Sequence, residues 1–396
     1  MAGPVRAHIL PWAAPVTAMA VVSVSLSLSV PLFALLLERQ GVSGAAIGLN
    51  HTVSALAMVV AAPLLPRVLA RIGLVRLMVG ACLILAFGML AIPMWESQFW
   101  WGLLRIGFGA TGTALFFASE YWVVTMAPEA MRGRIVGAYV VILSASYMIG
   151  PLMLNALGVD GQAIFVVPAL IFLAACVPVF LGAAHAPSGR TDTPPRTLDV
   201  LRFFRSDPML TWGVVLFGVI EFGAMSLIAV WGLRSGLDQE TAVRLVFWLA
   251  FGSLAFQLPV GWAAERFDRR RLLVLAALVS VIAPVVMLVS SSVAMSISAV
   301  VIWGGAAVAF YTLALTELGA RYKGAQLARG NAAVVLAYGL GALISPAAFG
   351  AAMDLVPPDG LLWLAAFAAC AYLAMGLIRL SRLRAGGLDR ADETSR

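Results

Sequence analysis

Apolar residues fill this chain in long runs, and short polar segments separate them. A transmembrane helix needs about 20 predominantly apolar residues to cross the hydrocarbon core of a bilayer. Twelve runs reach this length, and they start near residues 12, 45, 76, 99, 134, 163, 209, 240, 272, 293, 332 and 361. The pattern therefore predicts an all-α membrane protein with twelve transmembrane helices.

The composition excludes several classes of protein. Hydrophobic residues occupy 62% of the 396 positions and charged residues 11%, whereas soluble domains contain about 45–50% and about 25%. The surplus of apolar side chains must face lipid, so the bilayer is the first partner that we expect. A cytosolic protein or one that binds nucleic acid does not fit these figures.

Basic residues gather on one side of the predicted topology. If successive loops alternate between the two sides, 22 of the 26 Lys and Arg residues fall on the side that holds both termini. The opposite loops and the spans keep Arg39, Arg105, Arg234 and Arg244. Because loops rich in Lys and Arg stay in the cytoplasm, we expect both termini there.

A polar segment divides the chain into two halves. Residues 185–208 are rich in Pro, Thr, Asp and Arg and lie between the sixth and seventh apolar runs, which is typical of a linker. We interpret this segment as cytoplasmic. It separates an N-terminal six-helix bundle, residues 1–184, from a C-terminal six-helix bundle with a short cytoplasmic tail, residues 209–396.

The two halves repeat one pattern of charges. Glu120 ends the fourth run and Arg132 follows twelve residues later, and Glu317 and Arg329 reproduce this pair 197 residues further along. Many transporters are built from such duplicated bundles. The repeat predicts two pseudo-symmetric six-helix bundles.

Three segments resemble the major facilitator superfamily. The loop GWAAERFDRR, 261–270, is similar to the superfamily's GxLxDRxGRR loop, and its first-half copy keeps Arg71 but has Ala70 in place of the acid. The segment LLRIGFGATG, 103–112, resembles the fourth-span pattern RxxxG, and 132–152 resembles the fifth span. The order of these segments is most similar to the bacterial YcaD-like branch. This resemblance implies the superfamily fold and the bacterial inner (plasma) membrane, and it leaves the substrate open.

We expect a secondary active transporter that moves a small molecule by alternating access, coupled to protons, and that works as a monomer. The chain has no GxxxxGK[ST] segment for ATP. Its three histidines lie apart from any carboxylate cluster, so an enzyme, a cofactor and a metal site are not predicted. A multidrug or metabolite efflux antiporter and a non-transporting receptor with a transporter fold remain open.

Polar side chains within the spans are the candidates for binding. A charged group inside the hydrocarbon costs about 2.5–3.5 kcal/mol and is functional by default. Glu221, near the middle of the seventh run, is the leading candidate for a proton or a cationic substrate, and Arg105 in the fourth run for an anion or a proton relay. The remaining candidates are Ser23, Ser27, Asn50, His51 and Gln257. The two serines have a structural alternative, because serine hydroxyls also donate hydrogen bonds to carbonyl groups of their own helix.

Charges at the cytoplasmic ends of the spans predict two gates. In related transporters such charges resemble a latch that favours the outward-open state. The second-half loop keeps its acid and therefore has the better-equipped latch, formed by Glu317, Arg266, Arg269 and Arg329. The first-half latch would consist of Glu120, Arg71, Arg132 and Arg134.

Overall fold

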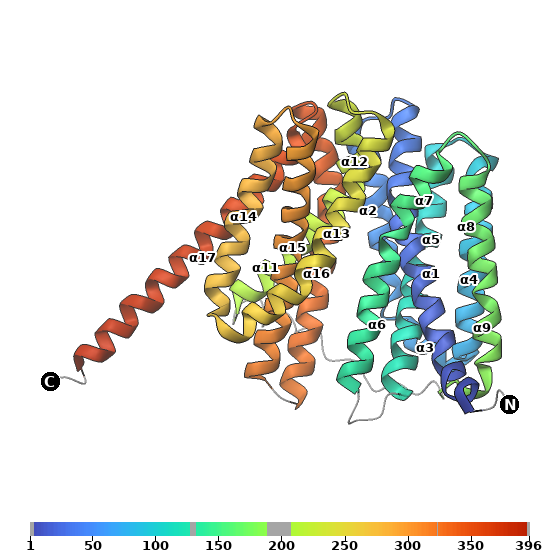
Figure 1. Cartoon of the computed structure of the whole chain (residues 1–396), viewed down its shortest axis with the longest axis horizontal. Helices are drawn as coiled ribbons and strands as arrows, with labels where there is room; N and C mark the ends of the chain where they lie inside the picture. Colours follow the sequence, from blue (N-terminus) through green and yellow to red (C-terminus); the bar gives the residue numbers. More distant parts are fainter. Residues whose placement is uncertain (1–3, 127–131, 188–206, 323, 394–396) are drawn as a thin grey trace. The chain divides into compact units, whose positions relative to one another are not determined.

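Every regular element of the described chain is a helix (Figure 1). This computed structural model describes residues 4–126, 132–187, 207–322 and 324–393. Ten stretches of these residues are long and apolar enough to cross a membrane, which makes the chain a multi-pass membrane protein. They are Ala14–Arg39, Gly44–Ala61, Leu74–Met94, Ala163–Leu181, Pro208–Arg234, Gln239–Arg266, Arg269–Val289, Val293–Arg321, Ala333–Leu355 and Gly360–Ser381.

The two other expected spans also lie in helices. The span expected near residue 99 coincides with α5 (Gln98–Met126), which carries Arg105 and several glycines. The span expected near residue 134 is divided between α6 (Arg132–Tyr147) and α7 (Ile149–Leu157). Neither is among the ten apolar stretches, so twelve spans stay a prediction.

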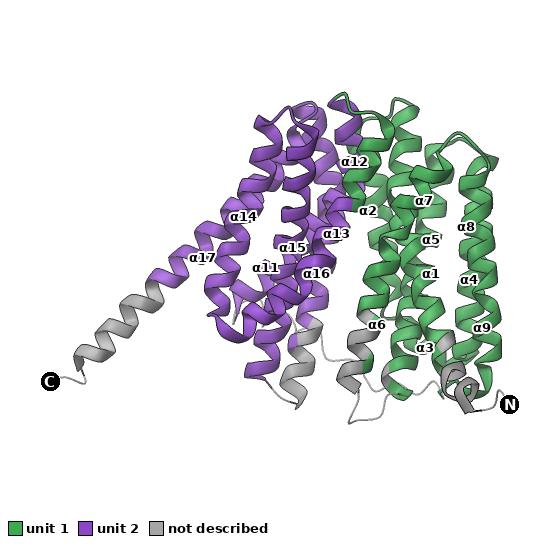
Figure 2. Cartoon of the chain, viewed as in Figure 1, with its two compact units in different colours: residues 1–193, 236–247 green, residues 194–235, 248–396 purple. Residues whose placement is uncertain are grey.

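Unit 1 contains residues 1–193 and 236–247 (Figure 2). Its long helices run side by side in the picture, and α1 packs against α5, α6, α7 and α9. Helix α5 also packs against α2 and α4, so it connects α1 with these two helices. Besides α5, α6 and α7, its helices are α1 (Pro4–Arg39), α2 (Gly44–Ala61), α3 (Leu65–Ile72), α4 (Leu74–Ala91), η1 (Ile92–Met94), α8 (Ala163–Ala174), α9 (Cys176–Leu181) and η3 (Ala183–His185).

Unit 2 contains residues 194–235 and 248–396. Its first membrane stretch is interrupted by one π-helical turn, η4, and this stretch packs against α15 and α16. A second layer is formed by α14, which contacts α15 and α17. The elements are α11 (Pro208–Gly218), η4 (Val219–Ala224), α12 (Met225–Arg234), α13 (Gln239–Arg266, which begins in unit 1), α14 (Arg269–Val289), α15 (Val293–Arg321), α16 (Gly324–Leu355) and α17 (Gly360–Glu393).

The first membrane stretch of each unit is the most enclosed. In both α1 and the α11–α12 stretch, 83% of the apolar window is buried, against 61% or less in the other eight stretches. Glycines permit this close packing, because a side chain on Gly150 of α7 would collide with Ser27 of α1. A side chain on Gly341 of α16 would collide with the Val215 carbonyl oxygen of α11. Each unit therefore holds its first stretch against a later helix through backbone contact.

Candidate functional site

Glu221 lies in the π-helical turn of the first stretch of unit 2. The turn follows α11, and 13 residues separate Pro208 from Glu221, which is about 20 Å at 1.5 Å per residue. This depth is near the middle of a hydrocarbon core of about 30 Å. Single π-turns inside α-helices occur frequently at functional sites. The backbone is therefore irregular at the residue with the leading candidate side chain.

The hydrogen-bond partner of Glu221 comes from α16. The Tyr338 hydroxyl hydrogen-bonds to the Glu221 carboxyl group, which is half-buried. The ring of Phe217 lies 5.5 Å from the Tyr338 ring and 5.3 Å from the Tyr311 ring, measured between centroids. Gly218 lets α16 approach, because a side chain there would meet the Tyr338 carbonyl oxygen. The site is thus a carboxyl group that is hydrogen-bonded to Tyr338, whose ring packs against Phe217, at a close contact between two helices.

Arg105, His51 and Asn50 gather in the interior of unit 1. Arg105 on α5 is 1% exposed, His51 on α2 is 0% exposed and Asn50 is 8% exposed. The Arg105 guanidinium lies 2.6 Å from the His51 Nδ1 atom and 5.4 Å from the centre of the Phe33 ring of α1. The structure therefore brings Arg105 next to His51, 54 residues earlier in the sequence and the direct neighbour of Asn50.

The remaining span candidates have local surroundings. The Ser23 hydroxyl donates to the Met19 carbonyl at 3.0 Å, and the Ser27 hydroxyl donates to the Val24 carbonyl at 3.4 Å. Both bonds lie within α1, which matches the structural alternative for serines in helices. Gln257 is half-buried on α13 and is not part of either cluster. Ser23 and Ser27 are therefore weaker candidates for substrate binding than Glu221 and Arg105.

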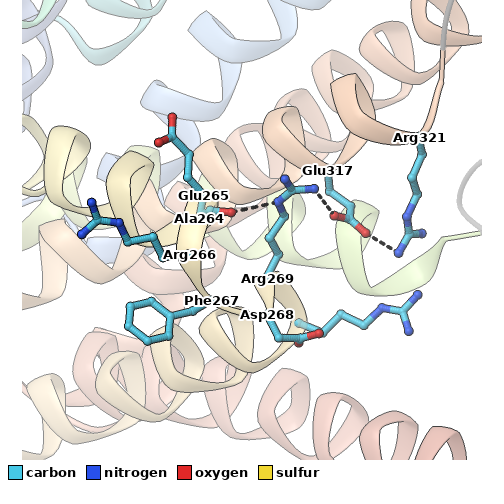
Figure 3. A pocket seen from close by; sticks show the side chains of 9 residues that line it. Ala264, Glu265, Arg266, Phe267, Asp268, Arg269, Glu317 and Arg321 are labelled. Atoms are coloured by element: carbon cyan, nitrogen blue, oxygen red, sulfur yellow. Dashed lines mark hydrogen bonds and ion pairs between the residues drawn. The ribbon is translucent and has the colours of Figure 1, made fainter.

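A network of charges occupies one end of unit 2 (Figure 3). Arg269 Nη1 donates to Glu317 Oε2 at 2.8 Å, and Arg321 forms an ion pair with the other Glu317 oxygen. The second nitrogen of Arg321 donates to Asp207 at 2.7 Å. A cavity of about 320 Å³ adjoins this network and is lined by Ala264, Glu265, Arg266, Phe267, Asp268, Arg269, Arg270, Glu317 and Arg321.

The network differs in membership from the predicted latch. Glu317 and Arg269 meet as expected, but the Arg266 guanidinium lies over the Trp262 ring, 4.1 Å from its centre. Sequence reasoning missed Arg321, although it lies one helical turn after Glu317. It also missed Asp207, for which the sequence offered no signal. Burial raises the pKa of Asp207, and the neighbouring Arg321 guanidinium opposes this shift.

The first-half latch is described only in part. Glu120 is exposed on α5, and Arg71 is exposed in the last turn of α3. The side chains of Arg132 and Arg134 lie outside the described residues, as does that of Arg329 from the second-half latch. No partner can therefore be assigned to them, and the first-half latch stays a prediction.

Comparisons with known proteins identify the family of the chain. The sequence profile of the Major Facilitator Superfamily matches residues 16–253 and 245–393. The chain is 25% identical over 329 residues to the MFS-type transporter YfkF of Bacillus subtilis (strain 168), covering 81% of this chain and 83% of YfkF. It is 23% identical over 282 residues to the MFS-type transporter YcaD of Salmonella arizonae, covering 70% and 71% of the two chains.

Solved transporter structures share the fold. The bacterial homolog of the human lysosomal transporter Spinster, in an inward-facing conformation, superimposes with a TM-score of 0.73 at 15% identity, covering 95% of this chain and 96% of the homolog. The nucleoside transporter NupG, in a mutant form, gives a TM-score of 0.78 at 10% identity, covering 93% and 99%. These findings point to a transport protein rather than an enzyme. The chain belongs to the Major Facilitator Superfamily, is related to its YcaD-like branch, and is a multi-pass membrane transporter.

Proposed function

We propose that the protein is a secondary active transporter that moves a small molecule by alternating access and couples this movement to protons. Residues 1–184 and 209–396 would be the two six-helix bundles of a twelve-span fold, joined by the cytoplasmic linker 185–208. A single chain supplies both bundles, so a monomer suffices. The observation that carries the proposal is Glu221, a titratable carboxyl group about halfway along a membrane stretch.

Proton binding at Glu221 changes both charge and hydrogen bonding. An ionised carboxyl group at this depth is costly unless it is paired, and it accepts a hydrogen bond from Tyr338. When Glu221 binds a proton the charge disappears, and the carboxyl group itself becomes a donor. The preferred packing of η4 on α16 then differs between the two forms. Such a difference is what coupling between proton binding and conformation requires.

The charge network of unit 2 supplies a gate in this proposal. Asp207, Arg269, Glu317 and Arg321 connect the ends of α11, α14 and α15. A relative shift of these helices must break ion pairs, so the network favours one arrangement. Loss of these pairs would accompany the change to the other state. Glu120 and Arg71 would take part in a weaker gate in the first half.

The same network suggests the orientation of the protein. The Arg-rich segment 265–271 lies at the end of unit 2 that holds the gate. Basic loops stay in the cytoplasm, so we place this end and both termini on the cytoplasmic side of a bacterial inner membrane. One solved structure with the same fold, at a TM-score of 0.69, is a D-xylose-proton symporter, so the fold is compatible with proton coupling.

Proton movement in proteoliposomes tests the proposal. Liposomes that contain the protein and a trapped pH-sensitive dye are exposed to pools of sugars, amino acids, organic anions and lipophilic cations. At least one pool should change the internal pH, and Glu221→Gln should abolish this change because the amide cannot titrate. Glu240→Gln is the matched control, since Glu240 is an exposed acid that pairs with Arg244 on its own helix.

Two results would contradict the proposal. The first is a pH change that is as fast with Glu221→Gln as with the wild type. The second is the absence of any pH change with every pool in the wild type. Elution of each variant as a single peak in size-exclusion chromatography confirms that it is folded, so a loss of signal can be assigned to coupling.

A further inference from the structure

The buried group of Arg105, His51 and Asn50 has a definite pattern of donors and acceptors. Arginine stays protonated in proteins and can only donate. The His51 Nδ1 atom, 2.6 Å from Arg105 Nη2, must therefore accept. An imidazole that accepts at Nδ1 carries its hydrogen on Nε2. His51 is thus neutral, and its Nε2–H points away from Arg105 as a second donor.

Three polar atoms of this group lack a partner among the described residues. They are Arg105 Nε, His51 Nε2 and Asn50 Oδ1. No ion pair joins Arg105 to a carboxylate within the described parts of the chain. Its remaining neighbours are the face of the Phe33 ring and Tyr147 on α6, which interacts with it electrostatically. Buried charges in proteins are normally paired, so this guanidinium needs a negative partner.

The side of α5 that carries Arg105 is packed less tightly next to Asn50 than it is one turn after Arg105. Gly102 lies one turn before Arg105, on the same face of the helix. A methyl group on Gly102 would have the Asn50 Nδ2 atom, at 3.9 Å, as its nearest neighbour outside α5. In contrast, Gly109, one turn after Arg105, is pressed against the Ser54 carbonyl oxygen of α2. The helices are therefore tightly packed on one side of Arg105 and looser on the side of Asn50.

We propose that Arg105, His51 and Asn50 bind a small organic acid, which is the substrate class of the transporter proposed above. The fixed positive charge and the unpaired Nε–H of Arg105 match the negative charge and an oxygen of a carboxylate. A hydroxyl group beside the carboxylate can accept from His51 Nε2–H and donate to Asn50 Oδ1, so a hydroxy acid satisfies all three atoms. That the bound acid is a transported substrate rests on the proposed function, whereas the binding site itself does not.

The charge of the group favours a monoanion. His51 cannot take up a proton without placing a second positive charge 2.6 Å from Arg105. Tyr147 is the other titratable side chain that interacts with Arg105, and a phenol is neutral near pH 7. Phe33 contributes only the negative face of its ring. The group thus carries one net positive charge, which one carboxylate neutralises.

Calorimetric titration of the purified protein in detergent tests this site. The probes are lactate and propionate, with their neutral amides lactamide and propionamide as controls. Lactate should bind most tightly, propionate more weakly, and the amides not at all. Arg105→Gln and His51→Ala should each weaken lactate binding by about tenfold or more, because the first removes the charge that pairs with the carboxylate and the second removes the donor to the hydroxyl group. Arg67→Gln, an exposed arginine on α3, is the matched control and should bind like the wild type.

Asn50→Ala separates a binding role from a structural one. It should remove the preference for lactate over propionate and leave propionate binding intact, which a general loss of packing would not do. It also keeps the test decisive if Arg105→Gln does not fold. Equal binding of acids and amides, absence of binding by either acid, or unchanged lactate preference in Asn50→Ala would overturn the assignment.

The titration is independent of proton coupling. It uses no membrane gradient, and Glu221→Gln should bind lactate like the wild type because Glu221 is not one of the residues assigned to this site. Lactate binding without any proton movement in liposomes would contradict the proposed coupling and retain this site. Proton movement driven by a neutral or cationic compound, without carboxylate binding, would retain the coupling and refute this site.

Discussion

The two units share a plan of packing but bury opposite charges. Each holds its first membrane stretch against a later helix through a glycine, Gly150 in unit 1 and Gly341 in unit 2. Unit 1 encloses a guanidinium, Arg105, among neutral partners, whereas unit 2 places a carboxyl group, Glu221, beside a tyrosine. The shared packing is a matter of backbone contact, and the chemistry depends on which polar side chain occupies the interior. A repeated scaffold can therefore carry two different sites.

The ends of the units differ in a related way. The repeat places Glu120 and Glu317 at corresponding positions, yet Glu120 is exposed and Glu317 is enclosed by two arginines. Equivalent residues in a duplicated sequence thus have different surroundings. Three measurements test these differences between the two units.

The largest effect on stability is expected at the glycine contacts. Gly341→Ala and Gly150→Ala insert a methyl group into backbone contacts, and overpacking costs about 1–3 kcal/mol. Gly80→Ala on α4 is the control, because nothing lies within 4 Å of its added methyl group. This change should stabilise by up to about 1 kcal/mol, as alanine favours helix more than glycine. Thermal unfolding can be followed by the loss of helical circular dichroism, which reports on both units.

If both units depend on their glycine contacts, Gly341→Ala and Gly150→Ala lower the unfolding temperature and Gly80→Ala does not. A drop for only one of the two contact variants would show that the packing plan is not shared.

A smaller effect is expected from the two corresponding acids. Glu317→Gln leaves two arginines without their shared carboxylate, and removing one partner of a buried pair costs 3–5 kcal/mol. The side chains of Arg269 and Arg321 are 26% and 33% exposed, so solvent screening reduces the expected loss to about 1–2 kcal/mol. Glu120→Gln should change stability by less than about 0.5 kcal/mol. Similar losses for both variants, in the same thermal assay, would contradict the difference between the two ends.

The smallest effect is a pH dependence of opposite sign at two loop acids. Burial raises the pKa of Asp207 above 3.8, so its contribution to stability is full below that pH and is lost as the pH rises through the raised value. The Arg39 guanidinium lowers the pKa of Asp160 below 3.8, so its contribution is present above that pH and is lost as the pH falls. Unfolding temperatures of Asp207→Asn and Asp160→Asn, measured against wild type between pH 3 and 7, should therefore diverge in opposite directions. Parallel curves would refute these assignments.

Some of the candidate site could be predicted from local spacing. Arg321 lies one helical turn after Glu317, and Arg266 lies one turn after Trp262, so both contacts follow the i, i+4 rule for helices. The predicted latch paired Arg266 with Glu317 and included neither the Arg321–Glu317 pair nor the Arg266–Trp262 contact. The ion pair of Asp207 with Arg321 joins residues 114 positions apart, and no local pattern indicates it. The contact of His51 with Arg105 spans 54 positions and depends on how α2 and α5 are rotated.

Apolar runs of sufficient length must face lipid whatever their partners are, so the sequence alone identifies a membrane protein. The segments 103–112 and 261–270 add the resemblance to the Major Facilitator Superfamily. The sequence also singled out Glu221, since a charge within an apolar run is visible without a structure. The position of Glu221 in a π-turn against Tyr338 is visible only in the folded structure, and so is the contact of Arg105 with a neutral histidine. Those pairings depend on helix rotation and on close approach at glycines, which are set by contacts between segments distant in sequence.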